Sequence, residues 1–179
     1  MRRIDKPKPD EYPEYSEIYM SLLEDDGRIL DHFKQQLMDL KNLVYNLPEE
    51  KLLYRYAPGK WTIKEILVHN IDDERIFSYR ALRYARNDDT PISGFDQESY
   101  ARHSGANERS LESIFEEYEA VRNATIMLFK NLPEESLMRS GAGIDENGQI
   151  VNKRTVRALV YHLAGHERRH MNIIKERYL

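Results

Sequence analysis

Apolar side chains recur at three- and four-residue steps in four stretches of this chain, and each stretch predicts a long amphipathic helix. Thr62 and Glu65 have the spacing of a capping box, which marks the start of the second helix. The only strand signal is a short hairpin over 144–151 that turns at Asn147-Gly148. The four predicted helices run approximately over Asp26–Asn46, Thr62–Arg86, Ser110–Asn131 and Thr155–Tyr178.

The connection between the second and third helices, Asn87–Arg109, is long for a compact bundle. A crossover that returns along the bundle explains this length, because it makes the second and third helices parallel. We therefore expect an all-α fold, a four-helix bundle with down-up-up-down topology, in which the second and fourth helices are antiparallel. The side chains expected to be largely buried are Phe33, Leu37, Trp61, Ile66, Phe115, Tyr118, Leu128 and Leu159.

A weak internal repeat supports two helical hairpins. Residues Asn46–Leu52 match Asn131–Leu137, and Lys60–His69 echo Lys153–His162. Chance or a shared pattern at helix starts also produces similarity of this size, so gene duplication is one of two interpretations. Two such hairpins packed together form a four-helix bundle.

Length and composition fit a single domain over residues 1–179. A net charge of −4 and a pI of about 5.9 give no basic surface for nucleic acid or an anionic membrane. The start of the chain is polar and rich in proline, with no apolar leader segment, so the expected location is the cytoplasm. The chain has no Cys, which excludes disulfides, thiolate zinc sites and a cysteine nucleophile.

His166 and His170 stand one turn apart on the fourth helix, and they therefore project from one face at a spacing that suits a shared metal ion. His69 is the candidate third ligand. It lies seven residues after Thr62, while His170 lies eight before Tyr178. If the two helices are antiparallel, His69 and His170 lie at depths along the bundle that agree to within roughly 2 Å.

The combination of several motifs is more specific than any one of them. These motifs are Tyr54–Glu65, His69 with Asp73-Glu74-Arg75, Pro91 followed by Gly94–Gln97, and Ala164–His170. From Tyr12 onward the chain resembles the DinB/YfiT-like superfamily of bacterial proteins described as metal-dependent enzymes. The resemblance implies the same bundle topology and one divalent metal ion, held by residues that match His69, His166 and His170. Some relatives transfer low-molecular-weight thiols onto electrophiles or isomerise substrates with the help of a thiol, while many have no assigned reaction.

Three neutral imidazoles leave coordination positions open, which is typical of a catalytic site and not of a closed structural one. Nitrogen ligands suit zinc or nickel, with iron or cobalt as alternatives. Such an ion lowers the pKa of bound water or of a substrate thiol. Because the chain has no Cys, any thiol must arrive with a substrate.

The segment His166–His170 also fits the H-E-x-x-H signature of zinc proteases, which makes Glu167 a candidate catalytic base. Only nine residues follow His170, too few to supply the downstream ligand of that class. The alternative interpretation places Glu167 in solvent or in an ion pair with Arg168 or Arg169. A di-iron carboxylate site is excluded, because Glu167-x-x-His170 is the only motif of its kind in the sequence.

Several residues are candidates for the surroundings of the ion. The candidate carboxylates that would accept hydrogen bonds from the imidazole rings are Asp72, Asp73, Glu74 and Asp96. His162 lies one turn before His166, and it is expected to be a neighbouring core histidine more than a ligand. The crossover is a candidate wall over the open coordination position. An equally weighted alternative is that its side chains only pack on the bundle and hold the crossover in place. The crossover residues concerned are Phe95, Asp96, Gln97 and Tyr100.

Two functions of different classes remain open. The first is a metal-dependent enzyme, a thiol S-transferase or hydrolase-like catalyst that acts on a small electrophile. The second is a non-catalytic, stress-associated module for metal binding or protein interaction. The 12 Tyr residues and the aromatic crossover, together with the family resemblance, also lead us to expect a homodimer.

Overall fold

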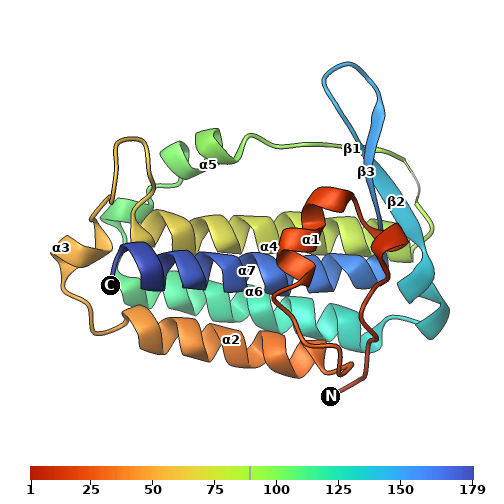
Figure 1. Ribbon diagram of the computed structural model, residues 1–179, viewed down its shortest axis with the longest axis horizontal. Helices are drawn as coiled ribbons and strands as arrows, with labels where there is room; N and C mark the ends of the chain where they lie inside the picture. The colour runs from red at the N-terminus through yellow and green to blue at the C-terminus, as the bar shows by residue number, and fades with distance from the viewer. Residues whose placement is uncertain (89) are drawn as a thin grey trace.

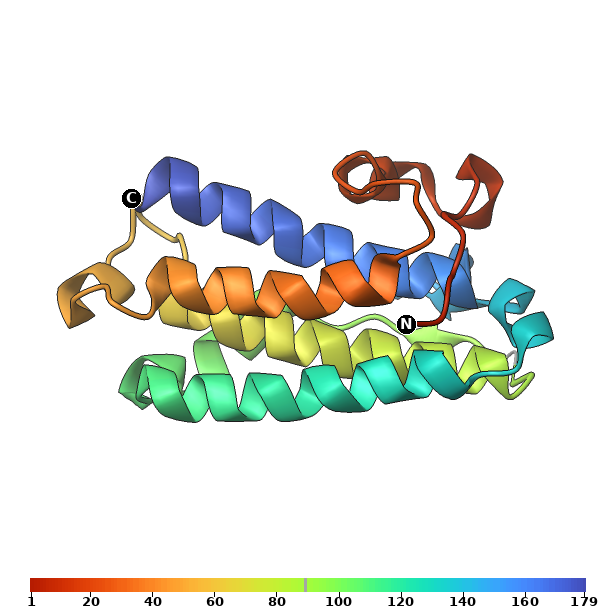
Figure 2. The same ribbon diagram turned by 90° about the horizontal axis from the view of Figure 1, so that it is seen from below.

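A computed structural model describes residues 1–88 and 90–179 and contains four long helices side by side (Figure 1). Two of them, α4 and α6, run in one direction, while α2 and α7 run in the other (Figure 2). The expected down-up-up-down bundle is therefore confirmed. The helices are α2 (Ile29–Val44), α4 (Ile63–Ala85), α6 (Leu111–Asn131) and α7 (Val156–Arg177).

The core lies where α4 packs against both α6 and α7, and where α2 packs against the same two helices. Of the side chains expected to be buried, six are fully so, whereas Trp61 and Leu128 are only partly covered. Trp61 precedes the first turn of α4 and lines a pocket, which explains its exposure. No helix among the described residues has the length and apolar character that crossing a membrane requires.

The N-terminal segment forms an outer layer over the bundle, which the hydrophobic pattern did not predict. It holds the short helices η1 (Pro9–Glu11), η2 (Glu14–Ser16) and α1 (Glu17–Met20). Helix α1 packs against α7, where Gly165 allows a close approach, because a Cβ there would lie 2.5 Å from the Tyr19 carbonyl oxygen. The bundle thus gains a wall beside the middle of α7.

Short elements also connect the long helices. Between α2 and α4 lies α3 (Glu49–Leu52), and after α6 comes η4 (Glu134–Met138). The crossover from α4 to α6 carries β1 (Ile92–Ser93), α5 (Gln97–His103) and η3 (Ala106–Glu108). It travels along the outside of the bundle, with α5 packed on α4 (Figure 1).

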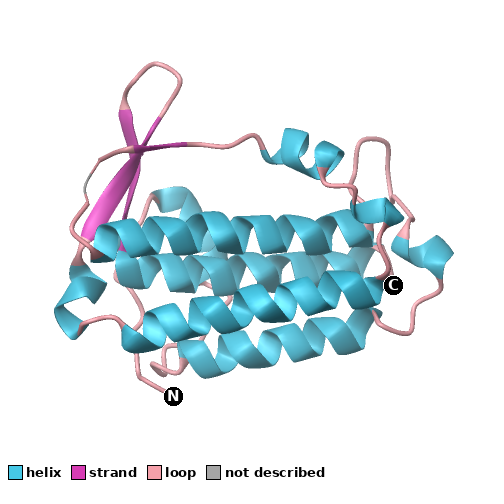
Figure 3. Cartoon of the chain, turned by 180° about the vertical axis from the view of Figure 1, so that it is seen from behind, coloured by secondary structure: helices cyan, strands magenta, loops and turns pink. Residues whose placement is uncertain are grey.

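A small sheet stands at one end of the bundle (Figure 3). Strand β2 (Ser140–Ile144) pairs antiparallel with β3 (Ile150–Thr155), and β1 pairs parallel with β2. The predicted hairpin is therefore present, but it is longer than 144–151 and extends to the residue that caps α7. Thr155 ends β3, and its hydroxyl accepts the hydrogen bond from the Ala158 amide that begins α7.

Candidate metal centre

Three histidines meet between α4 and α7, as the antiparallel arrangement predicted. The Nε2 atom of His166 lies 3.2 Å from Nε2 of His69 and 3.2 Å from Nε2 of His170. His69 comes from the second turn of α4, whose start is fixed by the Thr62–Glu65 capping box. His166 and His170 come from successive turns of α7. One nitrogen from each ring thus lies within 4.8 Å of the other two.

The geometry and protonation of these nitrogens fit a divalent ion. Metal–nitrogen bonds of 2.0–2.1 Å in tetrahedral geometry separate the ligand nitrogens by roughly 3.3 Å, close to the two observed spacings. Burial lowers the pKa of His69 and of His166 to about 4, and lowers that of His170 well below its ordinary value. All three rings are therefore neutral near pH 7, as metal ligands must be. A cation bound between the three rings would account for both short distances between Nε2 atoms.

A carboxylate and an indole support the three rings. Asp73 Oδ2 lies 3.5 Å from His166 Nδ1, and burial raises the pKa of Asp73 to about 6. The Trp61 ring lies 4.6 Å from His69 and stacks over His170, measured between ring centres. Among the four carboxylates considered from the sequence, the described residues place only Asp73 beside one of these rings. This carboxylate can fix the orientation of His166, as partners of metal-bound histidines do.

The other carboxylates that were considered have different roles. Both oxygens of Glu74 accept hydrogen bonds of 3.1 Å from Arg122 Nε, so this carboxylate is engaged with an arginine and not with an imidazole. Asp96 caps α5 by accepting from the backbone amides of Glu98 and Ser99.

Glu167 lies in a buried network, and it forms the ion pair that one interpretation expected, although with a different arginine. Its Oε2 accepts from the Tyr118 hydroxyl and the Arg122 guanidinium, and its Oε1 lies 3.3 Å from Gln36 Nε2. The ion-pair partner is therefore Arg122, from α6, and not Arg168 or Arg169. Because its oxygens are engaged there, Glu167 is not placed to act as a base at the three histidines.

His162 is a core histidine beside the site, in agreement with the sequence prediction. Its ring stacks on Phe77, with ring centres 4.3 Å apart and planes 6° apart, and its edge meets Tyr19. It is not part of the group whose nitrogens converge. The sequence did not reveal Tyr19 as a neighbour of the site, because its segment carries no motif.

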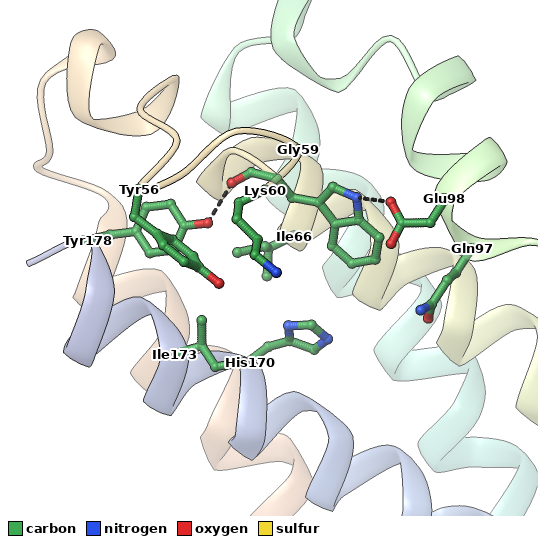
Figure 4. Close-up of a pocket in the computed structure, with 10 residues that line it drawn as sticks. Tyr56, Gly59, Lys60, Ile66, Gln97, Glu98, His170, Ile173 and Tyr178 are labelled. Carbon is green, nitrogen blue, oxygen red and sulfur yellow. Dashed lines mark hydrogen bonds between the residues drawn. The ribbon is translucent and has the colours of Figure 1, made fainter.

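Two pockets reach the histidines from different sides. The Trp61 pocket, of about 200 Å³, includes His170 in its wall (Figure 4). It is bounded by Tyr56, Gly59, Lys60, Trp61, Ile66, Gln97, Glu98, His170, Ile173 and Tyr178. The Tyr19 pocket, of about 260 Å³, includes His166. It is bounded by Tyr15, Tyr19, Asp73, Phe77, Arg80, Gly94, Phe95, Gln97, Asn152, His162 and His166.

The crossover forms part of both walls. Gln97 lines both pockets, and Phe95 lines the Tyr19 pocket. Glu98 accepts a hydrogen bond of 3.0 Å from the Trp61 indole, the dashed contact at Glu98 in Figure 4. Tyr100 is exposed and packs on Phe95 instead. Phe95 and Gln97 thus line pockets that reach the histidines, whereas Asp96 and Tyr100 line neither pocket, and a wall over the open coordination position stays a prediction.

Comparison with known proteins gives consistent matches. The family model described as the DinB superfamily matches residues 32–174. A protein of Oceanobacillus iheyensis, which carries the provisional name of metal-dependent hydrolase, is 33% identical over 137 residues, covering 76% of this chain and 75% of its own. The solved structure of YfiT from Bacillus subtilis, described as a probable metal-dependent hydrolase with an unusual four-helix bundle topology, superposes with a TM-score of 0.73. That match covers 86% of this chain and 87% of YfiT at 15% identity, and it shows a shared fold.

Proposed function

This chain belongs to the DinB superfamily, and on that premise we propose that it is a divalent-metal-dependent enzyme whose ion is held by His69, His166 and His170. The observation that carries the proposal is the cluster of three imidazole nitrogens within 4.8 Å of one another, in which both distances to His166 Nε2 match ligand spacing. Zinc or nickel suits this donor set best, with iron or cobalt as alternatives.

The reaction we propose is nucleophilic attack on a small electrophilic substrate. When bound, the ion supplies a Lewis acid and lowers the pKa of a water or thiol beside it. The chain itself surrounds the rings: the Asp73 carboxylate lies beside His166, and the Trp61 ring packs on His69 and His170. Three protein ligands leave room for substrate, and two pockets lead to the ligands.

Hydrolysis is the first candidate reaction. It is supported by the provisional name of the relative from Oceanobacillus iheyensis and by the description of YfiT, whose fold this chain shares. Water is then the nucleophile, and one of the two pockets is sufficient for the substrate. Hydrolysis therefore leaves the second pocket without a role.

Thiol transfer is the second candidate, and the pair of pockets favours it. A two-substrate reaction needs a place for the thiol and another for the electrophile, and the two pockets each contain one member of the histidine group. Because the sequence has no Cys, the thiol would be a free low-molecular-weight compound.

One experiment separates these candidates. Zinc-loaded and nickel-loaded protein is incubated with a chromogenic ester and with a chromogenic alkylating electrophile, each with and without a small thiol. Turnover of the ester without thiol supports the hydrolase, and turnover only with thiol supports the transferase. Metal-bound protein that turns over no substrate in any combination would contradict both and favour a non-catalytic metal-binding module.

A further inference from the structure

Two arginines near the candidate metal centre have no carboxylate partner among the residues that the structure describes. The Arg80 guanidinium reaches only the Ser93 carbonyl, at 3.5 Å, and its Nε has no hydrogen-bond partner. Arg154 donates to the Asn152 carbonyl and to the hydroxyls of Tyr15 and Ser16, and its Nε likewise has no partner among the described residues. Such cations usually find an anion when they are removed from water, as Arg122 does with two glutamates.

Both guanidinium groups lie beside the same aromatic ring. The Cζ atoms of Arg80 and Arg154 are 4.7 and 5.6 Å from the centre of the Phe77 ring, whose plane also stacks on His162. Arg80 comes from α4, whereas Arg154 comes from β3 and is almost fully buried. The bundle and the small sheet thus bring two positive charges to one place.

That place opens toward the histidines. Arg80 lines the Tyr19 pocket together with His166. A second cavity, of about 200 Å³ under the small sheet, is lined by both arginines. The two cavities share Arg80, Gly94 and Asn152, so Arg80 stands between them, whereas Arg154 lines only the cavity under the sheet.

The two arginines carry the positive charge of this region. Arginine keeps its proton in proteins, so both guanidinium groups are charged. Asp73 lines the Tyr19 pocket and Asp145 lines the cavity under the sheet, and among the described residues neither carboxylate forms an ion pair with Arg80 or Arg154. Unpaired, planar donors in a pocket are suited to bind an oxyanion through two parallel hydrogen bonds.

We propose that Arg80, supported by Arg154, binds an oxyanion group of the substrate, a carboxylate or a phosphate, while the reacting end of that substrate extends along the Tyr19 pocket to the three histidines. The position of the reacting end rests on the proposed function, whereas the anion site itself does not. The substrate class that follows is a small anionic electrophile or an anionic thiol.

Calorimetric titration of the full chain with succinate and, separately, with inorganic phosphate tests the anion site. It is performed on metal-free protein, so that binding to the ion does not contribute. Binding of either probe is expected, and Arg80→Met should weaken it about 10- to 100-fold, the usual effect of losing a charged hydrogen bond. Whichever probe binds more tightly identifies the oxyanion.

Two control variants make the result specific. Arg75→Met removes an exposed arginine of α4 that pairs with Glu117, and it should leave anion binding unchanged. His170→Ala should abolish turnover and also leave anion binding unchanged, so failure of the anion site and failure of the metal centre are distinguishable. If neither probe binds, or if Arg80→Met binds as tightly as the parent, the proposal is wrong.

Discussion

The Nε2 atoms of His69 and His166 lie 3.2 Å apart although 97 residues separate the two histidines in the chain. This contact depends on the antiparallel packing of α4 and α7. A parallel arrangement would displace the histidines of α7 by roughly 12 Å along the helix axis. The crossover that makes α4 parallel to α6 therefore also assembles the candidate metal centre.

Asp73→Asn should weaken metal binding without removing it. The Asp73 carboxylate lies beside His166 Nδ1 and can fix the ring with Nε2 toward the ion. Loss of such an outer partner typically reduces metal affinity about 10- to 100-fold. Competition with a metal-binding dye measures this affinity. An affinity equal to that of the parent would show that Asp73 does not orient the ligand.

Glu167→Gln should lower stability but leave metal binding intact. The substitution removes a charged partner of Arg122, and we expect a loss of about 1–3 kcal/mol in the free energy of unfolding. Arg122→Met should cost more, about 3–5 kcal/mol, because it leaves two buried carboxylates without their cation. Urea unfolding and metal content, measured on the same samples, check both. Loss of metal from folded Glu167→Gln protein would show that Glu167 contributes to metal binding after all.

Gly165→Ala should loosen the wall that α1 forms. The new Cβ would lie 2.5 Å from the carbonyl oxygen of Tyr19, so backbone must shift, at a cost of about 1–3 kcal/mol. Gly94→Ala is the matched control, because no atom lies within 4 Å of a Cβ built there. Thermal unfolding compares the two variants. Equal midpoints would contradict the close approach of α1 to α7.

The Glu11 carboxylate should stabilise the protein in a manner that depends on pH. Burial would raise the pKa of Glu11, but hydrogen bonds from Arg157, the Lys8 amide and Thr155 outweigh it and hold the pKa below the usual 4.5. Stability from a lowered carboxylate pKa is present above that usual value and is lost as pH falls through the folded-state value. The parent should therefore exceed Glu11→Gln in unfolding free energy at pH 7, with the difference shrinking below about pH 4. A difference that is constant with pH would show that the ion pair contributes nothing.

The sequence predicted the long helices from local pattern, whereas the candidate ligand set also needed the depths of His69 and His170 along antiparallel helices and the family resemblance. Apolar spacing placed each helix within three residues of its observed ends, and the Thr62 cap fixed the depth of His69 along α4. The pairing of Glu167 was not predictable in this way. Its partner, Arg122, is 45 residues away on another helix, and a charged residue in a helical pattern is ordinarily assigned to the solvent face.

The same limit applies to the pocket walls. The segment with Tyr15 and Tyr19 is polar and rich in proline, with no periodicity that indicates where it packs. Its position is set by tertiary contacts such as the Arg157–Glu11 ion pair and the fit of Tyr19 against Gly165. Such contacts join residues that are far apart in the chain, so the sequence pattern does not encode them locally.

The most direct test of the account is the metal content of protein purified without an affinity tag and dialysed after loading with zinc or nickel. We expect one ion per chain in the parent and in His162→Ala, because His162 is a core neighbour and not a ligand. His69→Ala, His166→Ala and His170→Ala should each lose most of the ion while remaining folded by circular dichroism. A parent that retains no ion, or folded single variants that all retain it, would contradict a three-histidine metal centre.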